Sequence, residues 1–176
     1  METLYLFKPA YYVRNYQNVD IRRLKQCGIQ LLLSDIDNTL VAWHEPDSNQ
    51  RVKKFIHNLE KEGIHVVLCS NSTPSRSKRF SADLHVPVYP LSFKPLQHSF
   101  KKAMNRYHVT PHQTAIIGDQ LLTDILGGNI AGVYTILTAP ITDDDKLSTR
   151  INRFFERFIY RNYEKRNLFK KGDFDD

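Results

Sequence analysis

Short apolar runs alternate with segments of helical periodicity between residues 31 and 138 of the chain. The apolar runs predict five strands, at Leu31–Ile36, Ile64–Cys69, Pro87–Leu91, Thr114–Gly118 and Tyr134–Thr138. Between them, apolar side chains recur at helical spacing, which predicts helices over Ser48–Glu62, Pro74–Leu84, Pro95–Tyr107 and Leu121–Ala131. Because strands and helices alternate, we expect an α/β fold: a doubly wound, mostly parallel five-stranded sheet with helices on both faces.

The pattern changes after Pro140. An apolar stripe at helical spacing runs among many Arg and Lys residues, and it consists of Leu147, Ile151, Phe154, Phe155, Phe158 and Ile159. We therefore divide the chain into a core with an N-terminal extension (1–140) and a basic amphipathic helical segment (141–176) packed on the same domain. A helix of this kind lies on an anionic membrane, or it packs its phenylalanines on the sheet and exposes its arginines; both alternatives stay open.

Composition narrows the class of protein. A chain of 176 residues with 41% hydrophobic and 25% charged residues is typical of one soluble globular domain. The net charge of +6 favours anionic partners. We see no apolar run of the ~20 residues that cross a bilayer, no signal-peptide pattern and only two cysteines. We expect a cytoplasmic protein without a transmembrane segment.

The end of the first predicted strand carries the most informative chemistry. Alternate side chains of a strand share a face, so Asp35 and Asp37 begin on the same side. Two unpaired carboxylates would repel each other, and a cation between them would remove that repulsion. Oxygen ligands of this kind suit Mg²⁺, and one carboxylate could act as a nucleophile. A polar turn that caps a helix is the alternative.

Polar residues also follow the other strands. Ser70 and Asn71 follow the second, Lys94 the third, and Gly118 and Asp119 the fourth, with Asp124 five residues later. Because ligands bind beyond the carboxyl ends of strands in a doubly wound sheet, we expect these residues to meet at one edge. Each has an ordinary structural explanation when taken alone: Ser70 could cap a helix, Lys94 could be solvated and Asp119 could belong to a turn.

Taken together, the order Asp-x-Asp-x-Thr, Ser, Lys and Gly-Asp-x-x-x-x-Asp resembles the phosphatases of the haloacid dehalogenase (HAD) superfamily. The resemblance covers about residues 25–140. The segments Asp-Ile-Asp-Asn-Thr-Leu, Cys-Ser-Asn, Phe-Lys-Pro and Ile-Gly-Asp-Gln-Leu-Leu-Thr-Asp look like the YqeG-type branch of subfamily IIIA. That branch is related to the phosphatidylglycerophosphate phosphatases of mitochondria and plastids. A HAD-like Rossmannoid core is the fold that the resemblance implies.

The resemblance also implies a role for each residue. Asp35 would attack phosphorus and form an aspartyl-phosphate, and Asp37 would act as general acid and base. Asp35, the backbone carbonyl of Asp37 and Asp119 would hold Mg²⁺. Ser70, Asn71 and Lys94 would bind the phosphate. Asp124 and Thr39 would support the site, although the Thr39 hydroxyl could instead bond local backbone.

Spacing bears on the substrate. In this superfamily an inserted cap domain often selects the substrate, and neither the stretch from Val41 to Glu62 nor that from Ser70 to Lys94 has room for one. The site should be open, which suits a phosphate on a membrane, a protein or a nucleic-acid end, or a small substrate if an oligomer supplies the missing wall. We find no nucleic-acid recognition motif.

The favoured function is Mg²⁺-dependent hydrolysis of phosphatidylglycerophosphate to phosphatidylglycerol, by a protein that is peripheral to the cytoplasmic face of the membrane. The alternatives are a phosphatase for a soluble or macromolecular phosphoester, and a non-catalytic binding or assembly protein built on the same fold.

Overall fold

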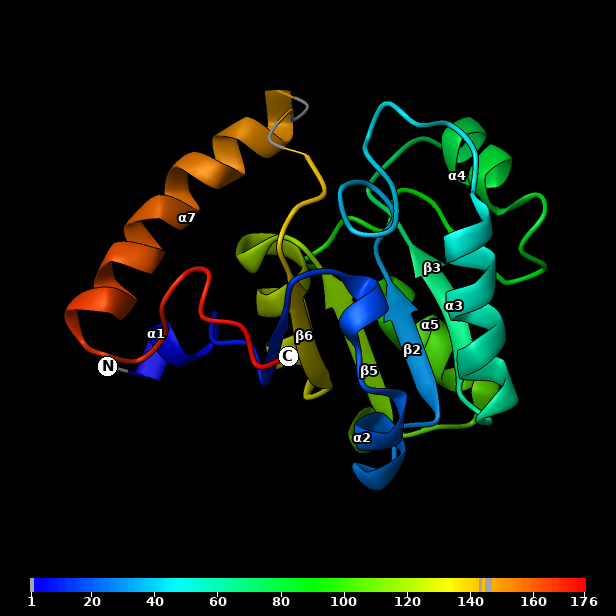
Figure 1. Ribbon diagram of the computed structural model, residues 1–176, viewed down its shortest axis with the longest axis horizontal. Helices are drawn as coiled ribbons and strands as arrows, with labels where there is room; N and C mark the ends of the chain where they lie inside the picture. The colour runs from blue at the N-terminus through cyan, green and yellow to red at the C-terminus, as the bar shows by residue number, and fades with distance from the viewer. Residues whose placement is uncertain (1, 143, 145–146) are drawn as a thin grey trace.

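A six-stranded parallel sheet forms the centre of the computed structural model, which describes residues 2–142, 144 and 147–176. The strand order across the sheet is β1-β6-β5-β2-β3-β4. In chain order the strands are β1 (Tyr11–Val13), β2 (Leu31–Ser34), β3 (His65–Cys69), β4 (Val88–Tyr89), β5 (Thr114–Gly118) and β6 (Tyr134–Thr138). Every neighbouring pair is parallel, so the carboxyl ends of all six strands lie at one edge (Figure 1).

The predicted α/β class and parallel sheet are confirmed, but the predicted number of five strands is wrong. The additional strand is β1, which pairs with β6 so that Tyr11 lies opposite Ile136. Its three residues are all buried, so it shows no alternation of polar and apolar side chains. A segment this short carries no periodic signal, and its strand geometry depends on the pairing with β6.

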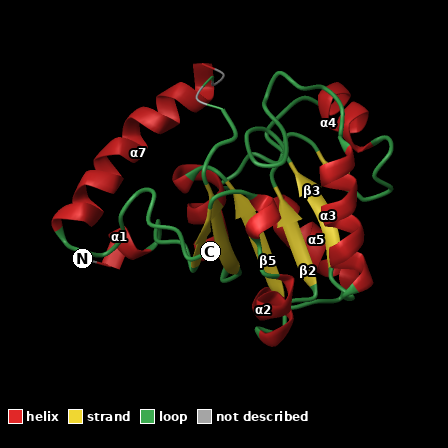
Figure 2. Cartoon of the chain, in the orientation of Figure 1, coloured by secondary structure: helices red, strands yellow, loops and turns green. Residues whose placement is uncertain are grey.

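Helices cover both faces of the sheet (Figure 2). They are α1 (Glu2–Tyr5), α2 (Ile21–Gln26), α3 (Gln50–Lys61), α4 (Pro74–Ser81), α5 (His98–Tyr107), α6 (Leu126–Ala131) and α7 (Leu147–Lys165). Short 3₁₀ turns lie at Tyr16–Asn18 and Pro111–Gln113. The helix predicted over Leu121–Ala131 begins as a π-helical turn, η3 (Leu121–Ile125), before it continues as α6.

The two faces of the sheet have separate apolar cores. On one face, side chains of β2 and β3 such as Leu32 and Val66 pack with α2, α3 and α4. On the other face, Leu33 and Val67 pack with α5, whose Phe100 is fully buried. Alternate residues of β2 therefore enter opposite cores, as expected for a central strand that is buried on both sides. This double packing makes β2 a rigid support for the residues that follow it.

The C-terminal helix α7 packs against the β1 side of the sheet (Figure 1). Its Tyr163 is buried and donates a hydrogen bond to the carbonyl of Leu4 at 2.7 Å. Ile159 and Tyr160 pack on a small apolar cluster that includes Tyr12. No helix in the described ranges is long and apolar enough to cross a membrane.

The last residues of the chain close the outer side of β1. The backbone N–H of Asp175 donates to the carbonyl of Tyr12 at 2.7 Å, and the Asp175 carboxylate accepts from the N–H of Tyr12 at 2.7 Å. The Asp176 carboxylate accepts from the N–H of Arg14 at 3.1 Å. The edge strand is thus paired on both sides, with β6 and with the C-terminal residues.

Candidate active site

Asp35 lies at the carboxyl end of β2 and is buried. Its backbone N–H donates to the carbonyl of Ile117 on β5 at 3.0 Å, which extends the sheet by one residue. The chain then turns sharply: the N–H groups of Thr39, Leu40 and Val41 all donate to the carbonyl of Ile36. This turn fixes the direction of the segment that carries Asp37.

Lys94 is buried and links two carboxylates. Its Nζ lies 2.7 Å from an oxygen of Asp35 and 2.7 Å from an oxygen of Asp124. Burial alone would lower the pKa of Lys94, but Asp124 and Asp35 raise the pKa above its usual value. The ammonium group therefore stays charged between the two carboxylates.

Asn71 holds the backbone that carries Lys94. Its amide oxygen accepts from the Lys94 N–H at 2.9 Å, and its amide nitrogen donates to the Lys94 carbonyl at 3.2 Å. The chain before Lys94 is unusual, because Leu91 and Phe93 have positive φ angles of 47° and 51°. Asn71 therefore positions Lys94; its predicted role in binding phosphate stays a prediction.

Asp119 follows β5 and is bound from two sides. Thr39 donates to one carboxylate oxygen at 3.2 Å, and the Arg153 guanidinium of α7 forms a very short ion pair with the other. Arg153 also donates to the Asp119 carbonyl at 2.6 Å and pairs with the buried Glu156 at 3.1 Å. Helix α7 thus supplies a cation to the same edge of the sheet that the four predicted strand ends form.

The side chain of Asp37 has hydrogen-bond partners of its own. The guanidinium of Arg76, on α4, donates to one of its oxygens at 2.8 and 2.5 Å, and Ser72 donates to the other. Ser70 lies close by, where its hydroxyl accepts from the N–H of Ser72 at 3.1 Å. Asp37 and Asp35 therefore have different bonding partners, although only one residue lies between them.

Three buried carboxylates could hold a cation. Asp35, Asp119 and Asp124 each offer an oxygen, and these oxygens all lie within 4.8 Å of one another. Burial raises the pKa of Asp35 and of Asp119, and the neighbouring carboxylates raise it further, although Lys94 and Arg153 oppose the shift. A divalent cation bound to these hard oxygen ligands would relieve that repulsion, so the residues fit a Mg²⁺-type ion.

Gly118 leaves room for this arrangement. A Cβ at this position would overlap the carboxyl group of Asp124 and lie 2.5 Å from its Cβ. Asp124 is fully buried on η3, where its other oxygen accepts from the Gln120 N–H at 3.2 Å. The glycine is therefore required by close approach at the end of β5.

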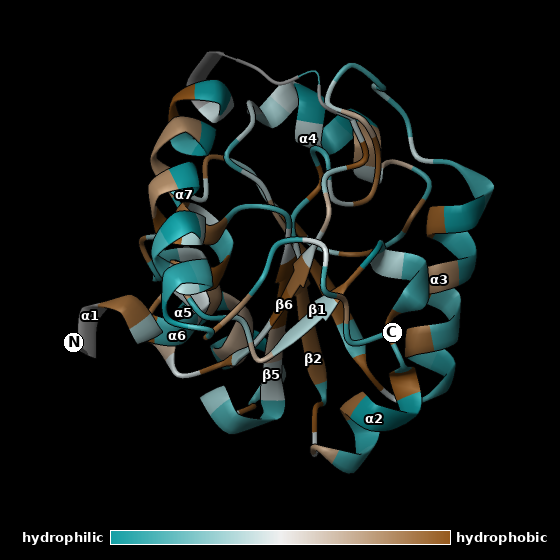
Figure 3. Ribbon diagram, turned by 60° about the vertical axis from the view of Figure 1, so that its left-hand side comes forward, coloured by the Kyte–Doolittle hydropathy of each residue, from teal (hydrophilic) through white to brown (hydrophobic). Residues whose placement is uncertain are grey.

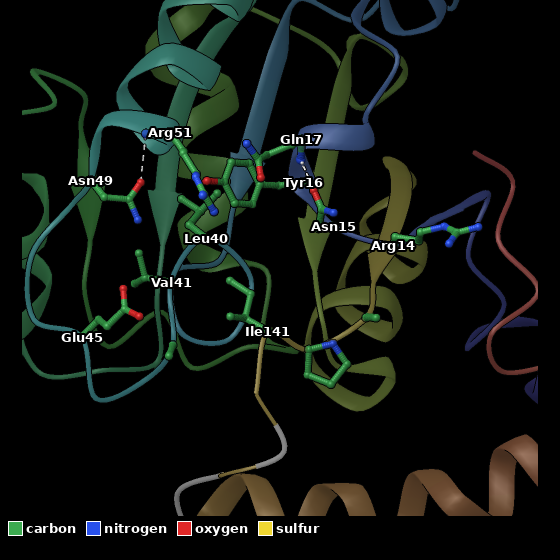
Figure 4. A pocket seen from close by; sticks show the side chains of 13 residues that line it. Arg14, Asn15, Tyr16, Gln17, Leu40, Val41, Glu45, Asn49, Arg51 and Ile141 are labelled. Atoms are coloured by element: carbon green, nitrogen blue, oxygen red, sulfur yellow. Dashed lines mark hydrogen bonds between the residues drawn. The ribbon is translucent and has the colours of Figure 1, made fainter.

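A cavity of about 80 Å³ opens beside Asp35 and Lys94. Its walls come from all four predicted strand ends and from α7, and they include Asp35, Asp37, Ser70, Asn71, Lys94 and Thr149. A second cavity, of about 380 Å³, lies between the turn after Asp37 and the segment 14–17 (Figure 4). The lining of that second cavity contains Arg14 and Arg51 but none of the clustered carboxylates, so the two hollows differ in chemistry.

The structure brings together the residues that the strand ends predicted, and it adds others. Arg76, Arg153 and Glu156 were not predicted for this site. Arg76 and Arg153 belong to a set of 25 Lys and Arg residues, and no spacing distinguishes them from solvated charges. Two of the three carboxylates that cluster, Asp35 and Asp119, were predicted as metal ligands, whereas Asp124 was expected only to support the site.

Comparison with known proteins assigns the family. A family model described as haloacid dehalogenase-like hydrolase matches residues 32–93, and a related HAD-hydrolase-like model matches residues 93–150. The Bacillus subtilis protein named "Probable phosphatase YqeG" is 36% identical over 153 residues, which cover 87% of this chain and 89% of that protein. The chain therefore belongs to the haloacid dehalogenase-like hydrolases, as a phosphatase of that superfamily.

Two further proteins are more distantly similar to this chain. The mitochondrial phosphatidylglycerophosphatase of Saccharomyces cerevisiae is 25% identical over 170 residues, which cover 88% of each chain. The cobalt-bound deoxy-D-mannose-octulosonate 8-phosphate phosphatase from Haemophilus influenzae superposes with a TM-score of 0.52 at 20% identity, covering 82% of this chain and 95% of that one. The latter similarity is one of fold.

Proposed function

We propose that this protein hydrolyses phosphatidylglycerophosphate to phosphatidylglycerol and inorganic phosphate, with Mg²⁺, at the cytoplasmic face of a membrane. The observation that carries the reaction is the group formed by Asp35, Lys94, Asp119 and Asp124 at the carboxyl edge of the sheet. The group combines a nucleophile with positive charge, which phosphoryl transfer requires.

In the first step, a carboxylate oxygen of Asp35 attacks phosphorus, and the bond from phosphorus to the glycerol oxygen breaks. Asp37 gives its proton to that leaving oxygen. Lys94 and Ser70 contact the transferring phosphoryl group, whose charge the ammonium of Lys94 offsets. In the second step, water attacks the aspartyl-phosphate, its proton passes to Asp37, and phosphate leaves.

The carboxylates of Asp35 and Asp119 would hold Mg²⁺, with the backbone carbonyl of Asp37 as a further ligand. The ion would neutralise negative charge on the phosphoryl oxygens as the bond breaks. Asp124 keeps Lys94 directed at Asp35 through its 2.7 Å contact. The contacts with Arg76 and Ser72 fix the direction of the Asp37 carboxyl group at the site.

Two observations support a lipid substrate. The loop around Lys94 exposes apolar side chains, since Leu91, Phe93 and Leu96 are 43%, 64% and 65% exposed. Between β2 and β4 the structure contains only loops, α3, β3 and α4, so no cap domain covers the site from these segments. An open site with apolar surroundings suits a phosphate that is presented at an interface, and the similarity to the yeast phosphatidylglycerophosphatase agrees with this.

The test is phosphate release from phosphatidylglycerophosphate in mixed micelles, with Mg²⁺ or with EDTA, beside a panel of soluble phosphoesters. Asp35→Asn is the control, because it removes the nucleophile at similar volume. We expect Mg²⁺-dependent release from the lipid and none from the variant. Release only from a soluble ester would reject the lipid substrate and keep the mechanism, whereas no release from any ester would favour a binding protein.

A further inference from the structure

One face of α7 is apolar and exposed to solvent. Ile151, Phe154, Phe155 and Phe158, here called the Phe stripe, are 54%, 55%, 54% and 48% exposed. Their spacing of three, four and seven residues places them on a single face of the helix. The rings of Phe154 and Phe155 lie 5.6 Å apart between centroids, and those of Phe154 and Phe158 lie 5.3 Å apart, so the stripe is continuous.

A row of positive charge runs beside the Phe stripe. Arg150, Arg157 and Arg161, here called the arginine row, are exposed and fall on one line of the helix surface at spacings of seven and four residues. We find no ion pair to these three guanidinium groups among the residues that the structure describes. The row therefore presents unneutralised positive charge next to exposed aromatic rings.

The opposite face of α7 contacts the rest of the fold. Arg153 bonds to Asp119, and Asn152 donates to the side chain of Gln120 at 2.9 Å. Tyr163 anchors the far end of the helix through Leu4. These contacts fix the orientation of the helix about its own axis, so the Phe stripe stays on the side that faces solvent. Figure 3 shows hydrophobic segments, coloured brown, along α7 at the rim of the molecule.

We infer that the Phe stripe and the arginine row dock the protein on the surface of an anionic lipid bilayer. Aromatic rings enter the boundary between headgroups and acyl chains, and adjacent basic residues bind anionic headgroups. This partner fits better than a second copy of the chain. Half-exposed side chains of this size offer roughly 100 Å² each, so the stripe supplies roughly half of the ~800 Å² per partner of a stable interface.

Docking in this way would bring the site to the bilayer. The first turn of α7 contributes Thr149 to the cavity that also contains Asp35 and Lys94. Arg153, on the opposite face from the Phe stripe, contacts Asp119. The same helix thus borders the site with one face and carries the Phe stripe on the other, so the site would lie near the bilayer surface. The docking surface consists of α7 residues alone, so binding to the bilayer does not depend on which phosphoester the enzyme hydrolyses.

The first test removes the apolar contribution. Phe154→Ser combined with Phe158→Ser is compared with Ile130→Ser, which changes a side chain that is 49% exposed outside the stripe. Sedimentation with phosphatidylcholine vesicles, with and without phosphatidylglycerol, measures binding, and thermal denaturation confirms that each variant is folded. We expect the double variant to lose vesicle binding and Ile130→Ser to retain it.

The second test removes the charge. Arg150→Gln, Arg157→Gln and Arg161→Gln are combined and compared with an equal loss of charge through Lys54→Gln, Lys61→Gln and Lys101→Gln, which are exposed on α3 and α5. Each basic residue near an anionic surface contributes about fivefold, so we expect the loss of three to lower vesicle binding on the order of 100-fold in the arginine variant. High salt should also weaken vesicle binding by the wild type, because it screens the attraction between the arginines and the anionic headgroups.

Equal binding of the wild type and both α7 variants would overturn the inference. A second result would also overturn it: the Phe154→Ser/Phe158→Ser variant loses self-association in sedimentation velocity but keeps its vesicle binding. The Phe stripe would then be a subunit interface. Neither result bears on the proposed lipid substrate, because these vesicles contain no phosphatidylglycerophosphate.

Discussion

Replacing Gly118 with alanine should disable the enzyme through Asp124. The added Cβ would lie 2.5 Å from the Asp124 Cβ and overlap its carboxyl group, whereas ordinary contacts begin at 3.4 Å. Asp124 is fully buried and its neighbours are close-packed, so relief requires a shift of about 1 Å in its side chain. That shift separates Asp124 from Lys94, which it contacts at 2.7 Å.

The expected magnitudes follow from this displacement. Overpacking a core position costs about 1–3 kcal/mol of unfolding free energy, which corresponds to a fall of about 2–12 °C in Tm for a chain of this size. A misplacement of about 1 Å in a catalytic group costs on the order of 100-fold in turnover. Gly118→Ala should therefore remain folded at low temperature and yet lose most of its kcat.

Gly128→Ala is the matched control. Its Cβ would lie 2.6 Å from methyl groups of Ile116 and Thr135, which is a comparable clash in a core that does not touch Lys94. Thermal denaturation and turnover of a soluble phosphoester at low temperature are measured for both variants. The control should lose stability and keep its kcat. Equal loss of kcat in the two variants, or wild-type kcat in Gly118→Ala, would refute the reasoning.

Three further predictions concern the charged groups around the cluster. Arg76→Ala should lower kcat less than Asp37→Asn does, because it frees the Asp37 carboxylate without removing it; steady-state kinetics compare the two. Mg²⁺ at about 100 times its Kd should stabilise the wild type by about 2.7 kcal/mol, roughly 5–11 °C in Tm, and Asp119→Asn should abolish this shift in a thermal melt. Arg153→Gln should cost about 3–5 kcal/mol of unfolding free energy, because it removes the cation that pairs with the buried carboxylates of Asp119 and Glu156. Burial raises the pKa of Asp119 to about 8 and Arg153 opposes that rise, so the variant raises the pKa further. Its loss of stability relative to the wild type should therefore grow as pH rises above about 8, and denaturant titrations that show the reverse slope would contradict this.

Much of the fold was predictable because its determinants are local. Strands such as Thr114–Gly118 are continuous apolar runs, and the helices between them repeat apolar side chains every three or four residues. The edge strand β1 was missed because its three residues acquire their geometry from β6. The loop before Lys94 was equally hidden, since no pattern predicts positive φ at Leu91 and Phe93, which are not glycines.

The residues of the site also include some that the sequence predicts and some that it does not. Asp35, Ser70 and Asp119 were predictable as neighbours because each follows a central parallel strand, and such strands end at one edge. Arg153 was not predictable as a neighbour of these residues, because its position depends on how α7 packs on the rest of the fold. Charge alone predicts a basic helix, and only the packing decides which of its arginines turns inward to Asp119.

The pairing of edge strand β1 with the C-terminal residues affects how densely the protein can cover a membrane. Docking on a bilayer would confine molecules to two dimensions, where unpaired strand edges template one another into aggregates. In this fold the backbone of Tyr12 on β1 is already bonded to Asp175, and the opposite edge strand, β4, is only two residues long. Both borders of the sheet are therefore poor templates, which allows the protein to gather densely on a surface while neighbouring molecules remain separate.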